Sequence, residues 1–230
     1  MTRRRRVLIV TAVEAERAAV LAGLALKDDP DPEQIVDPVP IVVEAVGVGA
    51  TAAAARTAPK LLLARSAGYP FHLVVSAGIA GGFADRAGVG STVLASRSVA
   101  ADLGADSPDG FLSLATLGFG QSTMDADKEL LTQMRSALPG AVVGDVLTVA
   151  TVTGTAEGAA TMLARWPGAV AEAMEGFGVA TAAAQEAVAF AELRTISNPV
   201  GPRERASWRI SDALAALTRA AAQLRDVFGR

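Results

Sequence analysis

The chain has 230 residues, of which 51% are hydrophobic and only 4% aromatic, and its formal net charge is −3 at pH 7. No uncharged apolar run reaches the roughly 18 residues that a bilayer-spanning helix needs, and the acidic balance argues against nucleic-acid binding, so we expect neither a membrane nor a nucleic acid as partner. The lack of cysteine and the single histidine, His72, exclude disulfides, thiolate nucleophiles and metal sites built from several cysteines or histidines.

The first half of the chain alternates apolar runs with alanine-rich segments, a pattern typical of strands followed by helices. Four arginines at residues 3–6 precede the first strand, and we interpret them as a solvated flank rather than a signal sequence. A segment with four prolines and four aspartates, residues 27–40, predicts a loop or hairpin. In chain order we expect a strand at residues 7–11, a helix at about 15–26, a strand at 41–46, a helix at 50–67, and a strand at 73–76 that enters a glycine turn at 77–82.

The second half continues the alternation. Residues 103–120 contain several glycines and are expected to be irregular. We expect strands at residues 93–100 and 189–196, a β-rich segment at 142–152, and helices at 126–137, 157–164, 176–187 and 208–227. No linker or internal repeat is evident, so the sequence predicts one α/β domain, residues 1–230, with a mostly parallel sheet.

Polar side chains at the predicted strand ends are the candidate binding residues, because open α/β sheets bind ligands at the carboxyl ends of their strands. Glu14 and Glu16 follow the first strand, where compensation of a helix dipole is the alternative role. Gly78 belongs to the glycine turn, whose spacing matches neither a dinucleotide-binding loop nor a Walker loop. Asn198 follows the strand at 189–196, and its amide suits the O6 and N7 edge of a 6-oxopurine, or the capping of a turn.

Two further charged residues lie in apolar surroundings. Glu175 is flanked by Met174, Gly176 and Phe177, so we expect its carboxylate to be half-buried and to need partners such as sugar hydroxyls. Arg194 lies two residues inside the end of a predicted strand. Because an unpaired buried arginine is costly, we expect a carboxylate partner for it, and Glu16 is a candidate.

Five segments together resemble the nucleoside phosphorylase and nucleosidase family, in the same order and spacing along almost the whole chain. They are "TAVEAE" (residues 11–16), "VGVGATAAA" (46–54), "SAGIAGGF" (76–83), "AMEGFGVA" (173–180) and "ELRTISNPVG" (192–201). The resemblance implies a three-layer α/β/α sandwich around a twisted mixed sheet and a small-molecule nucleoside substrate. It further implies a homo-oligomer such as a dimer or tetramer, with no cofactor and no metal. The composition is compatible with the cytoplasm.

Within this family, "ISNPVG" (196–201) followed by "SWRI" (207–210) looks most like the branch that hydrolyses futalosine and releases hypoxanthine, in an alternative menaquinone pathway. Asn198 stands where adenine-specific nucleosidases carry an aspartate, and Ile79 where they tend to carry a serine. Ser76 stands where phosphorylases place a phosphate-binding arginine, which implies that water is the nucleophile.

Two other activities stay open. A methylthioadenosine/S-adenosylhomocysteine nucleosidase, or another purine nucleosidase or phosphorylase, is the enzymatic alternative. A non-catalytic nucleoside-binding protein is an alternative of a different class, against which Glu16, Glu175 and Arg194 argue.

The resemblance also implies roles for individual residues. Glu16 would be the general base that orients the water, and Arg194 would help to hold that water. Glu175 would bind the ribose 2′ and 3′ hydroxyls, and Met174 would pack on the sugar. Asn198 would hydrogen-bond the departing hypoxanthine, although an amide cannot donate the proton that the base requires.

Three further positions, Gly78, Ser197 and Phe177, are expected to contact the substrate. Futalosine carries a carboxylate on its aromatic tail, so we also expect a basic residue on the 5′ side of the sugar. Arg203, Arg205 and Arg97 are available for that contact, and the sequence does not choose among them.

Overall fold

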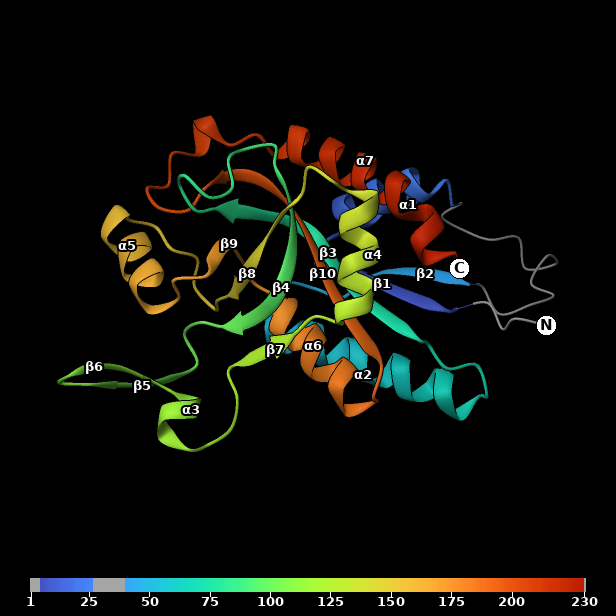
Figure 1. Cartoon of the computed structure of the whole chain (residues 1–230), viewed down its shortest axis with the longest axis horizontal. Helices are drawn as coiled ribbons and strands as arrows, with labels where there is room; N and C mark the ends of the chain where they lie inside the picture. Colours follow the sequence, from blue (N-terminus) through green and yellow to red (C-terminus); the bar gives the residue numbers. More distant parts are fainter. Residues whose placement is uncertain (1–4, 27–39, 230) are drawn as a thin grey trace.

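The computed structural model describes residues 5–26 and 40–229. The predicted loop at residues 27–40 and the first half of the arginine run therefore lie outside the described residues, apart from Pro40. Within them, a mixed eight-stranded sheet is covered by helices on both faces, as Figure 1 shows. This confirms the predicted α/β fold with a mixed central sheet.

The first strand, β1 (Val7–Thr11), shows how the two faces are filled. Val7 and Ile9 belong to a core cluster with Leu217 and Leu224, whereas Leu8 and Val10 pack in a second cluster. Successive side chains of a strand point to opposite faces, so a strand covered on both sides must be apolar throughout. The first cluster lies under α1 (Glu14–Leu24), α4 (Lys128–Ala137) and α7 (Ile210–Phe228), and the second under α2 (Ala50–Ser66) and α6 (Gly176–Gln185).

The strands pair in the order β10-β4-β8-β9-β3-β1-β2, and β7 adds to β4. Their bounds are β2 (Ile41–Ala45), β3 (Leu73–Gly82), β4 (Thr92–Ala100), β7 (Thr123–Asp125), β8 (Val142–Thr148), β9 (Ala169–Ala173) and β10 (Ala189–Pro199). β10 also pairs with β3, so β10, β4, β8, β9 and β3 close on themselves. Five pairings are parallel, and those of β10 with β4, β3 with β9 and β4 with β7 are antiparallel.

The predicted glycine turn at residues 77–82 is wrong. These residues continue β3, which runs from Leu73 to Gly82 and pairs with β10 along its length and with β9 at its end. Glycine often marks a turn because it tolerates unusual backbone angles. Here the backbone hydrogen bonds are made by strands on both sides, and the small residues serve close approach between elements instead.

The prediction that residues 103–120 are irregular is also wrong. They form a two-stranded hairpin, β5 (Gly104–Ser107) with β6 (Gly110–Ser113), followed by the short helix α3 (Leu114–Leu117). In Figure 1 this hairpin projects from one end of the molecule. The strands β7 and β9, of three and five residues, were not predicted as separate elements.

The end of the chain differs from the prediction in two places. β10 does not stop at Ile196 but extends to Pro199, with an irregularity in its pairing between Ile196 and Asn198. The terminal helix begins at Ile210, after a 3-10 helix at Arg205–Ser207. The helix α5 (Ala156–Arg165) lies close to its predicted position.

In the part of the chain that the structure describes, no helix is both long and apolar enough to cross a bilayer.

Candidate active site

A cavity of about 270 Å³ opens where β1, β3, β9 and β10 end. Its wall contains Ala12 just after β1, Gly81 at the end of β3, Glu172 on β9 and Asn198 on β10. β1, β3 and β10 are parallel neighbours, so their carboxyl ends meet at one edge of the sheet. A cavity at this edge agrees with the expectation that ligands bind at strand ends.

The cavity brings together five of the predicted site residues and leaves three outside its wall. The lining includes Glu16, Met174, Glu175, Ser197 and Asn198. Gly78, Phe177 and Arg194 do not line it. Arg194 lies directly behind the wall, whereas the backbone N–H of Phe177 donates a hydrogen bond to Oγ1 of Thr148, 3.0 Å away.

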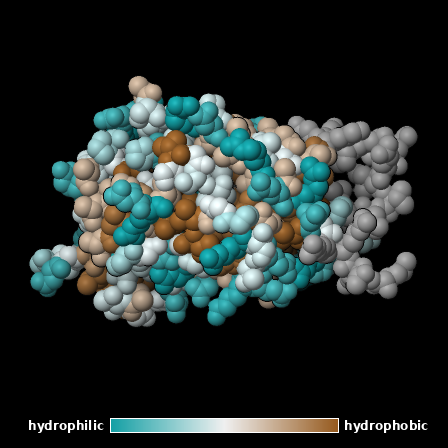
Figure 2. Space-filling model, turned by 45° about the horizontal axis from the view of Figure 1, so that its top comes forward, coloured by the Kyte–Doolittle hydropathy of each residue, from teal (hydrophilic) through white to brown (hydrophobic). Residues whose placement is uncertain are grey.

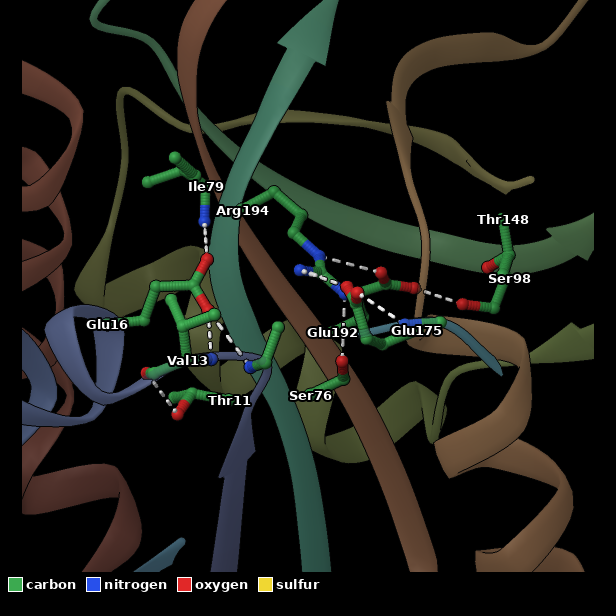
Figure 3. A network of polar contacts seen from close by, with 12 residues as sticks. Thr11, Val13, Glu16, Ser76, Ile79, Ser98, Thr148, Glu175, Glu192 and Arg194 are labelled. Atoms are coloured by element: carbon green, nitrogen blue, oxygen red, sulfur yellow. Dashed lines mark hydrogen bonds and ion pairs between the residues drawn. The ribbon is translucent and has the colours of Figure 1, made fainter. Parts of the chain in front are cut away.

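Glu16 is buried in the first turn of α1, with 3% of its surface exposed. Its Oε2 accepts hydrogen bonds from the backbone N–H groups of Ala12 (2.9 Å) and Val13 (3.2 Å), and its Oε1 accepts one from Ile79 (2.8 Å). Figure 3 shows this carboxylate spanning the gap between α1 and β3. Burial raises the pKa of Glu16, aided by the nearby charge of Glu175, although Arg194 and the backbone donors oppose the shift.

Glu14 and Glu16 lie in the same helical turn but in different surroundings. Glu14 is exposed and forms a 2.6 Å ion pair with Arg17. Glu16 accepts a hydrogen bond from the backbone N–H of Val13 at the start of the helix, and its side chain also lines the cavity. The structural and the chemical interpretation of Glu16 are therefore compatible with each other.

Arg194 is a fully buried cation on β10, with 1% of its surface exposed. Its Nε donates to Glu192 (2.9 Å), its Nη1 to Glu175 (3.3 Å) and its Nη2 to Oγ of Ser76 (3.0 Å), as drawn in Figure 3. Burial alone would lower the pKa of Arg194, but the charges of Glu192, Glu175 and Glu16 outweigh it and raise that pKa. The guanidinium is therefore permanently charged, and it is paired.

The predicted pairing of Arg194 with Glu16 is wrong in its partner, since the ion pairs run to Glu192 and Glu175. Glu192 is two residues before Arg194 on the same strand, so both side chains point to one face of the sheet. Their spacing in the sequence could have identified this pair. Burial raises the pKa of Glu192 despite Arg194 and a hydrogen bond from Ser98.

Glu175 links this cluster to the cavity. One carboxylate oxygen accepts from Arg194, and the other accepts from the backbone N–H of Gly49 at 3.1 Å. The side chain is 8% exposed and lines the cavity next to Met174. Glu175 is therefore more deeply buried than the expected half-buried carboxylate, and its expected need of partners is met by Arg194 and Gly49.

Asn198 and Ser197 form the part of the wall that β10 contributes. Oδ1 of Asn198 accepts a hydrogen bond from the Ser197 hydroxyl (2.7 Å), and Nδ2 donates to the carbonyl of Pro199 (3.0 Å). The carbonyl of Pro199 can only accept, so the amide of Asn198 must turn its Nδ2 towards Pro199 and its Oδ1 towards Ser197. Asn198 lines the cavity, and the second N–H of its Nδ2 has no acceptor among the described residues.

One carboxylate of the wall, Glu172, was not identified from the sequence. Glu172 is buried and lines the cavity, where its carboxylate accepts from the N–H and the hydroxyl of Thr153. The one sequence signal for Glu172 is its position two residues before Met174, because alternate residues of an extended segment face the same side. Arg203 is the one cationic side chain among the described residues of the lining, and its guanidinium lies 5.4 Å from the ring centre of Trp208.

The other two arginines considered for the substrate tail do not line the cavity. Arg97 is held by Asp145, with its Nε 3.1 Å from that carboxylate. Arg205 lies near Trp208, 5.8 Å from the ring centre. Within residues 5–26 and 40–229, no three His, Cys, Asp or Glu side chains gather in a way that could hold a metal ion.

The chain is similar to known proteins along almost its whole length. Residues 34–230 match the family described as the phosphorylase superfamily. The chain is 49% identical to a futalosine hydrolase of Streptomyces coelicolor, over 96% of this chain and 95% of the relative. Two solved structures share the fold at low sequence identity. The futalosine hydrolase of Helicobacter pylori has a TM-score of 0.80 at 16% identity, covering 97% of this chain and 98% of the other. The 5′-methylthioadenosine/S-adenosylhomocysteine nucleosidase of Neisseria meningitidis has a TM-score of 0.76 at 19% identity, covering 96% and 99%.

The packing at Gly78 gives a testable prediction. A Cβ atom at this position would lie 2.5 Å from Oε1 of Glu16 and 2.8 Å from Nη1 of Arg194. Gly78→Ala should therefore force both buried charges apart and lower the free energy of unfolding by about 1–3 kcal/mol, measured by urea denaturation. Gly140→Ala is the control, because a Cβ there meets nothing within 4 Å. Equal stability of the two variants would contradict the close approach.

Proposed function

The chain belongs to the futalosine hydrolase family within the phosphorylase superfamily, and on that premise we propose that it cleaves the N-ribosyl bond of futalosine with water and releases hypoxanthine. The observation that carries the proposal is the placement of Glu16, Glu175 and Asn198 on the wall of one cavity. The first two suit the sugar side of such a bond and the third suits a purine.

The charges around the cavity match the reaction. Cleavage of an N-glycosidic bond builds positive charge on the ribosyl ring and negative charge on the leaving base. Glu16, Glu175 and Glu192 surround the single cation Arg194, so carboxylates outnumber it near the sugar. Preorganised charges of this kind stabilise the developing cation without reorganising during the reaction.

We assign the general-base role to Glu16. Its Oε2 is occupied by two backbone donors, whereas Oε1 accepts only from Ile79 among the described residues and retains a lone pair for water. Arg194 acts as a positioning residue through Glu175, since it does not reach the cavity wall. Glu175 binds the ribose hydroxyls, with Met174 against the sugar.

Three other residues were predicted to contact the substrate, and only Ser197 among them lines the cavity. Ser197 acts through the amide of Asn198, whose Oδ1 it holds. Gly78 and Phe177 are outside the cavity wall, so we assign them no direct contact with the substrate. Gly78 instead provides the room in which Glu16 and Arg194 approach each other.

Hydrolysis is favoured over phosphorolysis by the absence of a phosphate-binding cluster in the described lining. Ser76 is buried and bonded to Arg194, and the only cation of the lining, Arg203, is on the loop after β10. A phosphate ion held against the sugar needs several donors or cations at one point. Arg203 is better placed for the carboxylate of the futalosine tail than Arg97, which Asp145 holds, or Arg205.

We further propose that the protein assembles as a homo-oligomer. Several large apolar side chains are exposed, among them Phe119 at 79%, Leu63 at 67% and Val48 at 55%. Figure 2 shows hydrophobic residues gathered in patches between hydrophilic ones on one face. Exposed apolar patches commonly mark protein interfaces. The menaquinone pathway and a cytoplasmic location remain expectations from the resemblance and the composition.

The central test of the proposed function is release of free base from candidate nucleosides. In phosphate-free buffer, hypoxanthine should appear from futalosine, detected by chromatography, and added phosphate should leave the rate unchanged. Adenine release from methylthioadenosine under the same conditions would instead support the related nucleosidase activity. Dependence on phosphate would exclude the hydrolytic assignment.

The role of Glu16 predicts both a mutant effect and a pH profile. Glu16→Gln should lower kcat by about 10²–10⁴, and Glu14→Gln, the exposed neighbour, should leave it unchanged. A base must be ionised, and burial raises the pKa of Glu16. The wild-type rate should therefore fall with decreasing pH already above the ordinary carboxyl range. A Glu16→Gln protein with normal kcat would refute the assignment.

The oligomer can be tested by sedimentation. The wild-type protein should sediment as a multiple of the monomer mass, and Phe119→Asp, which places a charge on the most exposed of these apolar side chains, should shift it towards the monomer. A wild-type protein that is monomeric at micromolar concentration would contradict the proposed homo-oligomer.

A further inference from the structure

Three residues of the cavity wall lie in one row across three neighbouring strands. Gly81 of β3 pairs with Asn198 of β10 on one side and with Glu172 of β9 on the other. Neighbouring strands are about 4.8 Å apart, so the Cα atoms of Glu172 and Asn198 are separated by roughly 10 Å. Residues paired directly across strands present their side chains on the same face, and all three line the cavity.

The middle of the row has no side chain. A Cβ atom at Gly81 would lie 2.9 Å from Cγ2 of Val200 and 3.5 Å from Nδ2 of Asn198. The glycine has no side chain of its own, and the apolar side chain of Val200 packs against it between the two polar side chains.

Glu172 forms the acceptor end of the row. It is 5% exposed, and each carboxylate oxygen accepts one hydrogen bond from Thr153, to Oε1 from the N–H (2.8 Å) and to Oε2 from the hydroxyl (2.5 Å). A carboxylate can accept about four hydrogen bonds, so lone pairs remain for a ligand. Among the described residues no cationic side chain forms an ion pair with it. Burial raises the pKa of Glu172, the hydrogen bonds from Thr153 oppose that shift, and the nearby charge of Asp102 adds to it.

Asn198 forms the donor end. Its Oδ1 is taken by Ser197, and one N–H of its Nδ2 is taken by the carbonyl of Pro199. The other N–H is available for a ligand acceptor. The row thus offers an acceptor on one side and a donor on the other, with the apolar surface of Gly81 and Val200 between them.

We propose that Glu172 selects the base of the substrate by accepting the N1–H of a 6-oxopurine, while Asn198 donates to its O6 and N7 edge. Hypoxanthine presents this order of donor and acceptors along one side of the ring. Adenine has a lone pair at N1 and an amino group at C6. It would therefore present an acceptor to the acceptor Glu172 and a donor to the donor Asn198. The inference rests on the proposed function and adds to it the group that discriminates between the two bases.

The substitution that tests this role is Glu172→Gln, which keeps the shape and replaces one acceptor by a donor. The amide can donate to N1 of adenine but can no longer attract an N1–H as a carboxylate does. kcat/KM for futalosine should fall by about 10–100-fold. The ratio of kcat/KM for futalosine to that for its 6-amino analogue should fall by about 10²-fold or more. Glu157→Gln, an exposed change in the first turn of α5, is the matched control and should leave this ratio unchanged.

A second measurement needs no variant and is unaffected by folding defects. Hypoxanthine should inhibit the wild-type enzyme as a product, and 1-methylhypoxanthine, which lacks the N1–H, should inhibit at least about 10-fold more weakly. Wild-type protein that releases no hypoxanthine from futalosine would overturn the proposed function itself. Active wild-type protein whose Glu172→Gln variant keeps the substrate ratio, or that binds both free bases equally, would overturn only the role of Glu172.

Discussion

The burial of Arg194 is the interaction on which the site depends. A guanidinium out of contact with water is costly unless every donor finds an acceptor, and here Glu192, Glu175 and Ser76 take that part. These three come from β10, from the start of α6 and from β3. Loss of Arg194 would leave Glu192 and Glu175 buried without their cation, at a cost of about 3–5 kcal/mol. The cluster therefore fixes the position of Glu175 at the cavity wall.

The closure of five strands explains why the cavity lies where it does. β3 pairs with β10 along its length, and on its other side it pairs first with β1 and then, at Gly81 and Gly82, with β9. Side chains from both neighbouring strands then face one point beyond the end of β1. Glu16 reaches the same point from the first turn of α1. One topological feature thus gathers groups from four segments of the chain.

The sequence allowed the order of the main elements, the α/β class and five residues of the cavity wall to be predicted. Local patterns sufficed for β1 and α2, because buried strands and alanine-rich helices leave clear signals. They failed for Gly78 to Gly82, since a glycine that serves close approach between strands resembles a glycine that serves a turn. They also failed for Glu172 and for the partner of Arg194. Which carboxylate meets which cation depends on strand register, and register is settled by pairings distant in the sequence.

The position of β10 in the sequence determines when the site can be assembled during synthesis. It is the last strand of the chain, yet it inserts between β3 and β4 and carries Glu192, Arg194 and Asn198. During synthesis the segments that hold Glu16 and Glu175 emerge first, and their final contacts wait for a strand made near the end. Such long-range pairing is slow to form, and here it cannot close before β10 has been made. A chain that lacks β10 therefore has no assembled site, so the ability to bind depends on this strand.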